Sequence, residues 1–282
     1  MTHPALTKGA VATVTGGAAG IGLAAAKQFA QLGLRVCIAD VDVDRLRGAA
    51  EEIAAQADGR VDDVLIVETD VSRVDDLRKL EAAVRDRFGG TDILMNNAGI
   101  QTGSGIFSAE NWQRLLEVNL WGVINGTQVF VPSMIAHGRL GLVINTGSKQ
   151  GITTPPGDPA YNVSKAGVKA FTEALQHELR NTPNCKISAH LLIPGFVFTN
   201  LTAPGRTEKP PSAWTPEQTI NFMMERLDVG DFYILCPDND VSRQLDERRI
   251  LWAAGDIVEN RPPLSRWHPD YAQLFEVFVR KT

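Results

Sequence analysis

Short apolar segments alternate with amphipathic segments along the chain, and no other feature constrains the fold so strongly. The apolar segments are mostly β-branched, as strands covered on both faces are. They predict strands at Ala10–Val14, Arg35–Ala39, Val64–Val67, Ile93–Met95, Leu142–Asn145, Ile187–Ile193 and Phe232–Cys236. Apolar residues at helical spacing predict helices between them, at Ile21–Leu32, Val43–Ala57, Val74–Phe88, Ala109–Ala136, Ala160–Asn181 and Pro216–Leu227. This order predicts an α/β fold with a doubly wound parallel sheet of about seven strands and helices on both faces.

The last third of the chain departs from this alternation. Residues 199–215 contain three prolines and indicate a long loop, and such loops inside compact domains are usually functional. Residues 238–282 follow the seventh strand and predict a helical C-terminal extension. Its expected helices are Val241–Val258 and Pro269–Arg280. Because α/β folds of 282 residues often form one domain, we expect residues 1–282 to be a single domain.

Charge and apolar patterning limit the partners and the location. A formal net charge of -5 and a pI near 5.6 argue against nucleic-acid binding, which needs a basic patch. The most apolar stretch, Gly9–Ala30, is broken by two threonines and five glycines and does not predict a membrane span. Met1–Gly9 lacks the apolar core of a secretory signal. Cys37, Cys185 and Cys236 are far apart, which indicates reduced thiols rather than disulfides or a zinc site. We therefore expect a cytoplasmic protein without a metal site.

A glycine-rich loop joins the first strand to the first helix. It reads Thr-Gly-Gly-Ala-Ala-Gly-Ile-Gly over residues 15–22 and contains Gly16, Gly20, Ile21 and Gly22. Glycines let the backbone approach a pyrophosphate, and the helix N-terminus offers free N–H groups to it. The spacing differs from the commoner G-x-G-x-x-G, so a loop that merely needs left-handed residues is the alternative.

Asp40 ends the second strand, about 20 residues beyond the loop. A carboxylate at this place accepts hydrogen bonds from the adenine ribose hydroxyls and repels the 2′-phosphate of NADP. No arginine or lysine occurs in residues 41–43, and Ala19 adds no positive charge. The residues therefore favour NAD over NADP, with a helix cap as the alternative role of Asp40.

Tyr161 and Lys165 are four positions apart in a predicted helix, so both lie on one face. A tyrosine with a pKa near 10 is a poor base at neutral pH, and a nearby ammonium would lower that pKa. Ser148 follows the fifth strand, at the sheet edge where ligands of α/β proteins bind. Its neighbour Lys149 is interpreted as a polar residue without a special role.

Asparagines mark the same predicted edge of the sheet. Asn97, followed by Ala98 and Gly99, comes directly after the fourth strand. Asn119 lies inside a predicted helix, where asparagine is a modest helix former and calls for an explanation. An exposed surface position is the alternative for Asn119.

Together these motifs resemble the short-chain dehydrogenase/reductase family, of the single-domain type. The matching elements are Thr15-Gly16-xxx-Gly20-x-Gly22, Asp70, Asn96-Asn97-Ala98-Gly99, Asn119, Ser148, Tyr161-xxx-Lys165 and Pro194-Gly195-xxx-Thr199. The resemblance implies a Rossmann-like sheet, NAD as cofactor, and hydride transfer between nicotinamide and a secondary alcohol or ketone. The catalytic residues would be Asn119, Ser148, Tyr161 and Lys165.

The resemblance also implies individual roles. Tyr161 would be the general base or acid, Lys165 would lower its pKa and bind the nicotinamide ribose, Ser148 would orient the substrate oxygen, and Asn119 would hold a water for proton relay. The implied cofactor-binding residues are Gly16, Gly20, Ile21, Gly22, Asp40, Asp70, Val71, Asn97, Ala98, Gly99, Tyr161, Lys165, Pro194, Val197 and Thr199.

The C-terminal third departs from the family pattern. A Gly-Gly signal expected after the seventh strand is replaced by Pro237-Asp238-Asn239-Asp240 and two further helices. We expect a homo-oligomer, either a dimer or the tetramer usual in the family. Residues 199–230 would form the substrate-binding loop and helix. Mostly apolar candidates for the pocket, including Phe107 and Trp214, favour a substrate with a hydrophobic or aromatic body.

Two other functions fit the same motifs. One is an NAD(H)-binding regulatory protein that performs no turnover, although the complete set of catalytic residues argues against it. The other is an epimerase or dehydratase of the same superfamily, although about 80 residues after Thr199 are few for the larger substrate domain of those enzymes.

Overall fold

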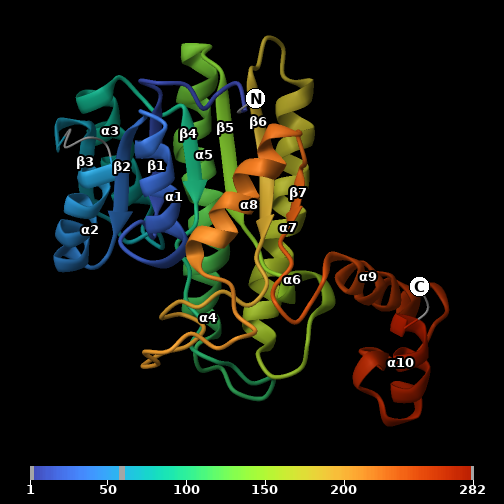
Figure 1. Ribbon diagram of the computed structural model, residues 1–282. Coiled ribbons are helices and arrows are strands. Elements are labelled where there is room, and N and C mark those ends of the chain that lie inside the picture. The colour runs from blue at the N-terminus through green and yellow to red at the C-terminus, as the bar shows by residue number, and fades with distance from the viewer. Residues whose placement is uncertain (1–2, 57–60, 281–282) are drawn as a thin grey trace.

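The computed structural model describes residues 3–56 and 61–280, and its core is one parallel sheet (Figure 1). The strands are β1 (Val11–Thr15), β2 (Arg35–Asp40), β3 (Val64–Glu68), β4 (Ile93–Asn96), β5 (Gly141–Thr146), β6 (Ile187–Ile193) and β7 (Tyr233–Leu235). The helices are α1 (Gly20–Gln31), α2 (Val43–Gln56), α3 (Val74–Phe88), α4 (Trp112–Leu116), α5 (Gly122–His137), α6 (Gln150–Thr153), α7 (Pro159–Asn181), α8 (Pro216–Asp228), α9 (Arg243–Val258) and α10 (Ala272–Arg280).

The sheet has the spatial order β3-β2-β1-β4-β5-β6-β7, and every neighbouring pair is parallel. The chain runs outward from β1 to β3 and then crosses back to β4. Residues 12–14 of β1 therefore pair with residues 93–95 of β4 at the point where the direction of winding reverses. Ligands of such sheets bind at the carboxyl ends of the strands beside this point. The predicted Rossmann-like fold is confirmed.

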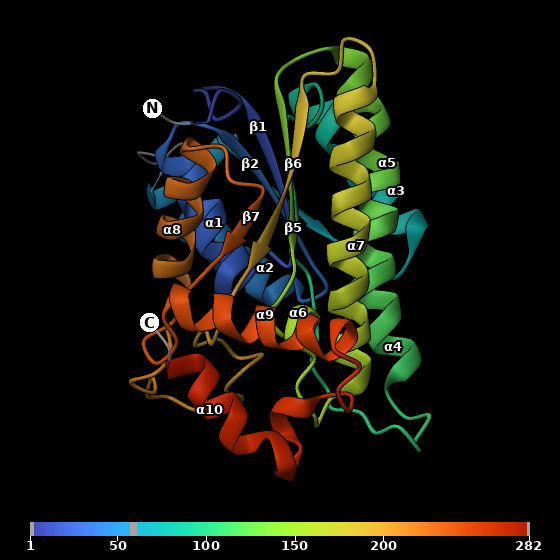
Figure 2. The ribbon, with the colours of Figure 1, turned by 90° about the vertical axis from the view of Figure 1, so that its right-hand side faces the viewer.

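Helices cover both faces of the sheet (Figure 2). Alternate residues of each strand point to opposite faces, so β1 sends Val11 into one core and Ala12 and Val14 into the other. Helices α1, α2 and α8 pack over the core that contains Ala12 and Val14, where Phe29 is fully buried. Helices α3, α5 and α7 pack over the core that contains Val11, where Phe130 is fully buried. These two cores hold the strand ends in fixed positions.

Several helix boundaries differ from the sequence-based prediction. The helix expected at Ala109–Ala136 begins at Trp112 and is interrupted by a π-helical turn at Glu117–Trp121. The helix expected at Pro269–Arg280 is a 3₁₀ turn over its first three residues followed by α10. The predicted end of the second helix, Ala57, lies outside the described residues. Apolar periodicity does not reveal these interruptions, because it is judged over windows of about 11–18 residues and each interruption is a single turn.

The predicted C-terminal extension is present as α9 and α10, which lie beyond the carboxyl end of the sheet (Figure 1). Ser242 caps α9 by accepting a hydrogen bond from the Leu245 N–H at 3.2 Å. Trp252 of α9 is buried against Phe275 of α10, with ring centroids 5.4 Å apart, and the guanidinium of Arg261 lies 4.0 Å from the centroid of the Trp252 ring. Within the described ranges, no helix combines the length and apolar character of a membrane span.

Candidate active site

The glycine loop folds tightly onto the start of α1. Gly16 and Gly20 have φ values of +63° and +54°, in the left-handed region that only glycine adopts readily. A Cβ added at Gly22 would lie 2.1 Å from the Gly16 carbonyl oxygen, so no side chain fits there. No side chain of the described residues caps α1, and the amides of its first turn, which includes Ile21, have no helical partner. This bare cradle of N–H groups fits the pyrophosphate of a dinucleotide.

Asp40 lies between the glycine loop and the end of β2. Its carboxylate accepts hydrogen bonds from the Ala18 N–H at 3.3 Å and from the Val41 N–H at 2.8 Å. Helix α2 is capped by Asp42, which accepts from the Arg45 N–H at 3.0 Å. Because Asp42 fills the capping role, Asp40 is held beside the loop instead, as an adenine-ribose partner would be.

The Asp70–Val71 segment forms the next part of this edge. Asp70 accepts hydrogen bonds from the Ser72 N–H at 3.0 Å and the Ser72 hydroxyl at 2.7 Å. Val71 is buried, and a Cβ added at Gly122 of α5 would lie 2.8 Å from it. The packing of α5 therefore fixes the backbone that would border the adenine.

Asn97 uses its side chain to join three strand ends. Its amide donates to the carbonyl oxygens of Thr15 at 3.2 Å and Gly16 at 3.3 Å, and its amide oxygen accepts from the Thr146 hydroxyl at 3.2 Å. Ala98 packs on the loop, with its Cα 2.8 Å from the position of a Cβ at Gly16. The segment 97–99 thus lies over the glycine loop, where it would line a bound cofactor.

Helix α7 brings Tyr161 and Lys165 to the carboxyl end of the sheet, where both are buried. Buried polar contacts hold the helix in register: Asn145 of β5 donates to the Thr172 hydroxyl at 3.0 Å and accepts from Asn96 of β4 at 2.9 Å. Such buried pairs specify one arrangement, because any shift would leave amides without partners.

The predicted Tyr161, Lys165 and Ser148 side chains come together. The Lys165 ammonium lies 5.8 Å from the centroid of the Tyr161 ring and donates to the Thr146 carbonyl oxygen at 2.9 Å. Ser148 lies close enough to the Tyr161 hydroxyl to lower its pKa. The Ser148 hydroxyl also accepts from the Gln150 N–H at 3.1 Å, which leaves its proton for another acceptor.

Burial shifts the pKa values of both Tyr161 and Lys165. Burial raises the pKa of Tyr161 to about 12; the Ser148 hydrogen bond opposes this increase, and the Asp158 carboxylate adds to it. Burial also lowers the pKa of Lys165 to about 8. In the protein alone the loss of solvation therefore dominates the pKa of Tyr161, whereas the lowering expected from Lys165 was for the site with oxidised nicotinamide bound and stays a prediction. At neutral pH the protein therefore holds Tyr161 as a neutral proton donor.

Asn119 lies in the π-helical turn and is fully buried, so the alternative of a surface position was wrong. Its amide oxygen accepts from the Ile100 N–H and its amide nitrogen donates to the Ile100 carbonyl, both at 2.8 Å. This pairing is the explanation for an asparagine inside a helix. The pairing fixes the backbone after Gly99 and occupies both polar atoms of the Asn119 side chain. The water predicted for proton relay would therefore have to bind the backbone of Asn119.

The segment from Pro194 to Thr199 lies against the glycine loop. Val197 is buried and forms an isolated parallel bridge with Trp214, which closes the base of the long loop between them. The methyl group of Thr199 lies 3.1 Å from the position of a Cβ at Gly20. The loop predicted to bind substrate therefore starts beside the predicted pyrophosphate cradle. Phe107, also expected near the substrate, is fully exposed.

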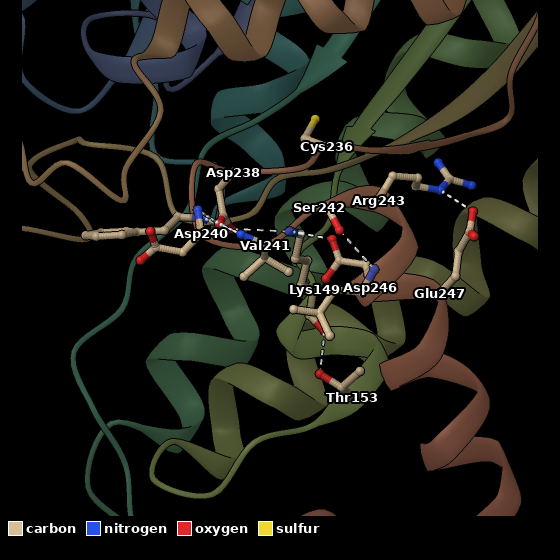
Figure 3. Close-up of polar contacts among 12 residues, drawn as sticks. Lys149, Thr153, Cys236, Asp238, Asp240, Val241, Ser242, Arg243, Asp246 and Glu247 are labelled. Carbon is tan, nitrogen blue, oxygen red and sulfur yellow. Dashed lines mark hydrogen bonds and ion pairs between the residues drawn. The ribbon is translucent and has the colours of Figure 1, made fainter. Parts of the chain in front are cut away.

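Lys149 was misjudged from the sequence. Instead of being a polar neighbour of Ser148, its ammonium lies 2.6 Å from a carboxylate oxygen of Asp246 and 3.3 Å from one of Asp238 (Figure 3). Both carboxylates are buried. Nothing in the run Pro237-Asp238-Asn239-Asp240 indicates which cation Asp238 meets, because Lys149 lies 89 residues earlier in the chain.

The fold and the site together define a Rossmann-type oxidoreductase with a nicotinamide cofactor. The sequence profile of the short chain dehydrogenase family matches residues 10–210. The chain therefore belongs to the short-chain dehydrogenase/reductase family.

Individual relatives agree with this assignment. The 3-oxoacyl-[acyl-carrier-protein] reductase FabG of Thermotoga maritima is 34% identical over 227 residues, which cover 80% of this chain and 85% of the relative. A short chain dehydrogenase/reductase from Burkholderia phymatum, solved in complex with NAD, has a TM-score of 0.80 at 29% identity and covers 91% and 96% of the two chains. An alcohol dehydrogenase from Thermococcus sibiricus, complexed with 5-hydroxy-NADP, has a TM-score of 0.72 at 26% identity, with 83% and 98% covered.

Proposed function

We propose that the protein is an NAD-dependent alcohol dehydrogenase or ketone reductase that acts on a secondary alcohol or ketone with a hydrophobic or aromatic body. The observation that carries the proposal is that Tyr161 is buried, with Ser148 beside it and the Lys165 ammonium 5.8 Å from the centroid of its ring. The four proposed catalytic residues are Asn119, Ser148, Tyr161 and Lys165.

The nicotinamide, when bound, supplies or accepts the hydride at the substrate carbon. In reduction, Tyr161 gives its hydroxyl proton to the carbonyl oxygen; in oxidation, its phenolate takes the proton from the alcohol. Ser148 holds the same oxygen by a hydrogen bond. Lys165 stabilises the phenolate that remains after proton transfer, and its bond to the Thr146 carbonyl keeps the ammonium in place.

A panel of alcohols and ketones tests the activity, with NADH absorbance as the measurement. Turnover of secondary alcohols or their ketones supports the proposal. Binding of NAD without turnover of any member would instead indicate a regulatory protein. Conversion of substrate without a net change in NADH would indicate an epimerase or dehydratase.

We propose NAD rather than NADP because Asp40 lies beside the glycine loop. Replacing it in Asp40→Ala should reduce the preference for NAD by about ten- to hundredfold, since a hydrogen bond to a charged group contributes roughly 1.5–3 kcal/mol. The ratio of kcat/KM with NAD to that with NADP is the measurement. Asp42→Ala is the matched control, since that carboxylate caps α2, and should leave the ratio unchanged. A wild-type preference for NADP contradicts the proposal.

The pKa values predict the pH dependence of ketone reduction. We expect kcat/KM to be constant near neutral pH and to fall above about pH 8, because Lys165, with its pKa lowered to about 8, loses its charge there. Tyr161, with its pKa raised to about 12, keeps its proton over this range. In Lys165→Arg the cation persists, so the decline should move upward by at least about one pH unit, whatever the absolute rate. An unmoved decline would assign it to another group.

The proposal also covers the domain organisation, the assembly and the location. Residues 1–282 would act as one oxidoreductase domain, with 199–230 as the substrate-binding loop and helix. A homo-oligomer, dimer or tetramer, is proposed from the family resemblance. Cys37 and Cys236 are free and buried, which supports a reducing compartment and hence the cytoplasm. Among the described residues, no group of three or more His, Cys, Asp or Glu side chains could hold a metal ion.

A further inference from the structure

A buried charged cluster joins the candidate active site to the C-terminal extension. It consists of Lys149, Asp238 and Asp246, whose side chains are 16%, 7% and 6% exposed. The three come from different parts of the fold: the end of β5, the turn after β7, and α9 (Figure 3). Burial raises the pKa of Asp246, although the Lys149 ammonium opposes this.

Asp238 holds more than the ammonium. One of its carboxylate oxygens faces Lys149 and also accepts from the Phe196 N–H at 3.3 Å. The other accepts from the Val241 N–H at 2.8 Å and the Asp240 N–H at 3.2 Å. The cluster therefore ties together the segments that follow β5, β6 and β7, and Phe196 belongs to the segment that reaches Thr199 and the glycine loop.

The backbone of Lys149, directly after Ser148, is also held by hydrogen bonds. Its N–H donates to the Pro194 carbonyl at 3.3 Å, and its carbonyl accepts from the Ile152 N–H at 3.0 Å at the start of α6. Helix α6 rests on α7 at the level of Lys165, since a Cβ added at Gly151 would lie 2.4 Å from the Lys165 carbonyl carbon. A displacement of Lys149 would move Ser148 relative to Tyr161.

We propose that Lys149 is a positioning residue, and that its ion pairs with Asp238 and Asp246 use the C-terminal extension to hold Ser148 against Tyr161. This inference rests on the proposed function. A buried ion pair is a poor source of stability, because desolvation cancels most of the attraction. The cluster is costly to bury and lies directly beside Ser148. A role in holding Ser148 in position therefore explains it better than a contribution to stability. A misplacement of about 1 Å in a site can cost about a hundredfold in rate.

The test replaces the ammonium while keeping the side-chain length. Lys149→Met should lower kcat by about ten- to hundredfold and leave the Kd for NAD within about twofold, since the cofactor cradle is built elsewhere. Because that variant removes the ammonium that lies between two buried carboxylates, the double variant Lys149→Met/Asp246→Asn is measured as well. In the double variant, Asp238 keeps its three backbone donors, so we expect that variant to fold. Lys149→Arg should restore kcat to within about threefold of wild type.

Hydrogen exchange of the amides in residues 147–153 gives a measurement that does not need turnover. We expect faster exchange there in both methionine variants and no change in the glycine loop. Glu247→Gln is the matched control. It removes the charge of an exposed ion pair on α9, in which the Arg243 Nε and Glu247 Oε1 atoms lie 2.8 Å apart. This change should alter neither kcat nor the exchange rates.

Two results would overturn the inference. A kcat within about twofold of wild type in both methionine variants would show that Ser148 is not positioned by Lys149. If the wild type turns over no substrate, the proposed function fails, and exchange in residues 147–153 then decides alone: unchanged exchange rejects the positioning role, and faster exchange supports it.

Discussion

Tyr161→Phe should lower kcat by about a hundredfold to ten-thousandfold, the usual range for loss of a general acid–base group. The phenylalanine ring fills the same buried space beside Ala160 and Leu115 and lacks only the hydroxyl that meets Ser148. The Kd for NAD should stay within about twofold and the melting temperature within a few degrees. Steady-state kinetics, a binding titration and thermal unfolding provide the three measurements.

Tyr233→Phe is the control for this substitution. Tyr233 also has a pKa raised to about 12, but it lies on β7, is half exposed and donates its hydroxyl to Glu173. The same loss of an oxygen there should leave kcat unchanged. Unchanged turnover in Tyr161→Phe, or an equal loss in both variants, would remove Tyr161 from the mechanism.

Gly22→Ala should weaken NAD binding by at least about a hundredfold, which corresponds to about 3 kcal/mol. The added methyl group would lie 2.1 Å from the Gly16 carbonyl oxygen and 2.6 Å from the Asn97 amide nitrogen. Because the first of these is backbone, the loop must open, and the cradle of N–H groups loses its shape. Such overpacking also costs roughly 1–3 kcal/mol of the free energy of unfolding. A binding titration and denaturant unfolding measure the two effects.

Gly48→Ala is the control for this substitution, because it adds the same methyl group in the neighbouring helix without a clash. A Cβ at Gly48 of α2 meets no atom within 4 Å. Alanine there should increase the free energy of unfolding by about 0.5–1 kcal/mol and leave the Kd for NAD unchanged. If Gly22→Ala binds NAD as well as Gly48→Ala does, the glycine loop is not the pyrophosphate site.

The two predictions probe different parts of one site. The first concerns a proton held by α7, whereas the second concerns a backbone cradle at β1 and α1. Their joint outcome separates loss of chemistry from loss of cofactor binding. The Lys149 variants add a third case, in which both parts stay intact and only the position of Ser148 changes.

Much of the architecture was determined by local sequence. The strands follow from short β-branched runs, because strands covered on both faces need apolar side chains on both. The parallel order follows from the helices between them. Gly22 is required by a contact within a few residues, and the four-residue spacing of Tyr161 and Lys165 places both on one helix face.

Contacts between distant segments could not be predicted from local sequence patterns. Asn119, in the π-helical turn, pairs its side chain with the backbone of Ile100, 19 residues earlier in the chain. Burial raises the pKa of Tyr161, and burial is a property of the packed whole. The partners of Lys149 lie in the turn after β7 and in α9, 89 residues away in the case of Asp238. Periodicity and motifs report neighbours along the chain, whereas the solvation of a group and the charge it meets are set only when remote elements pack together.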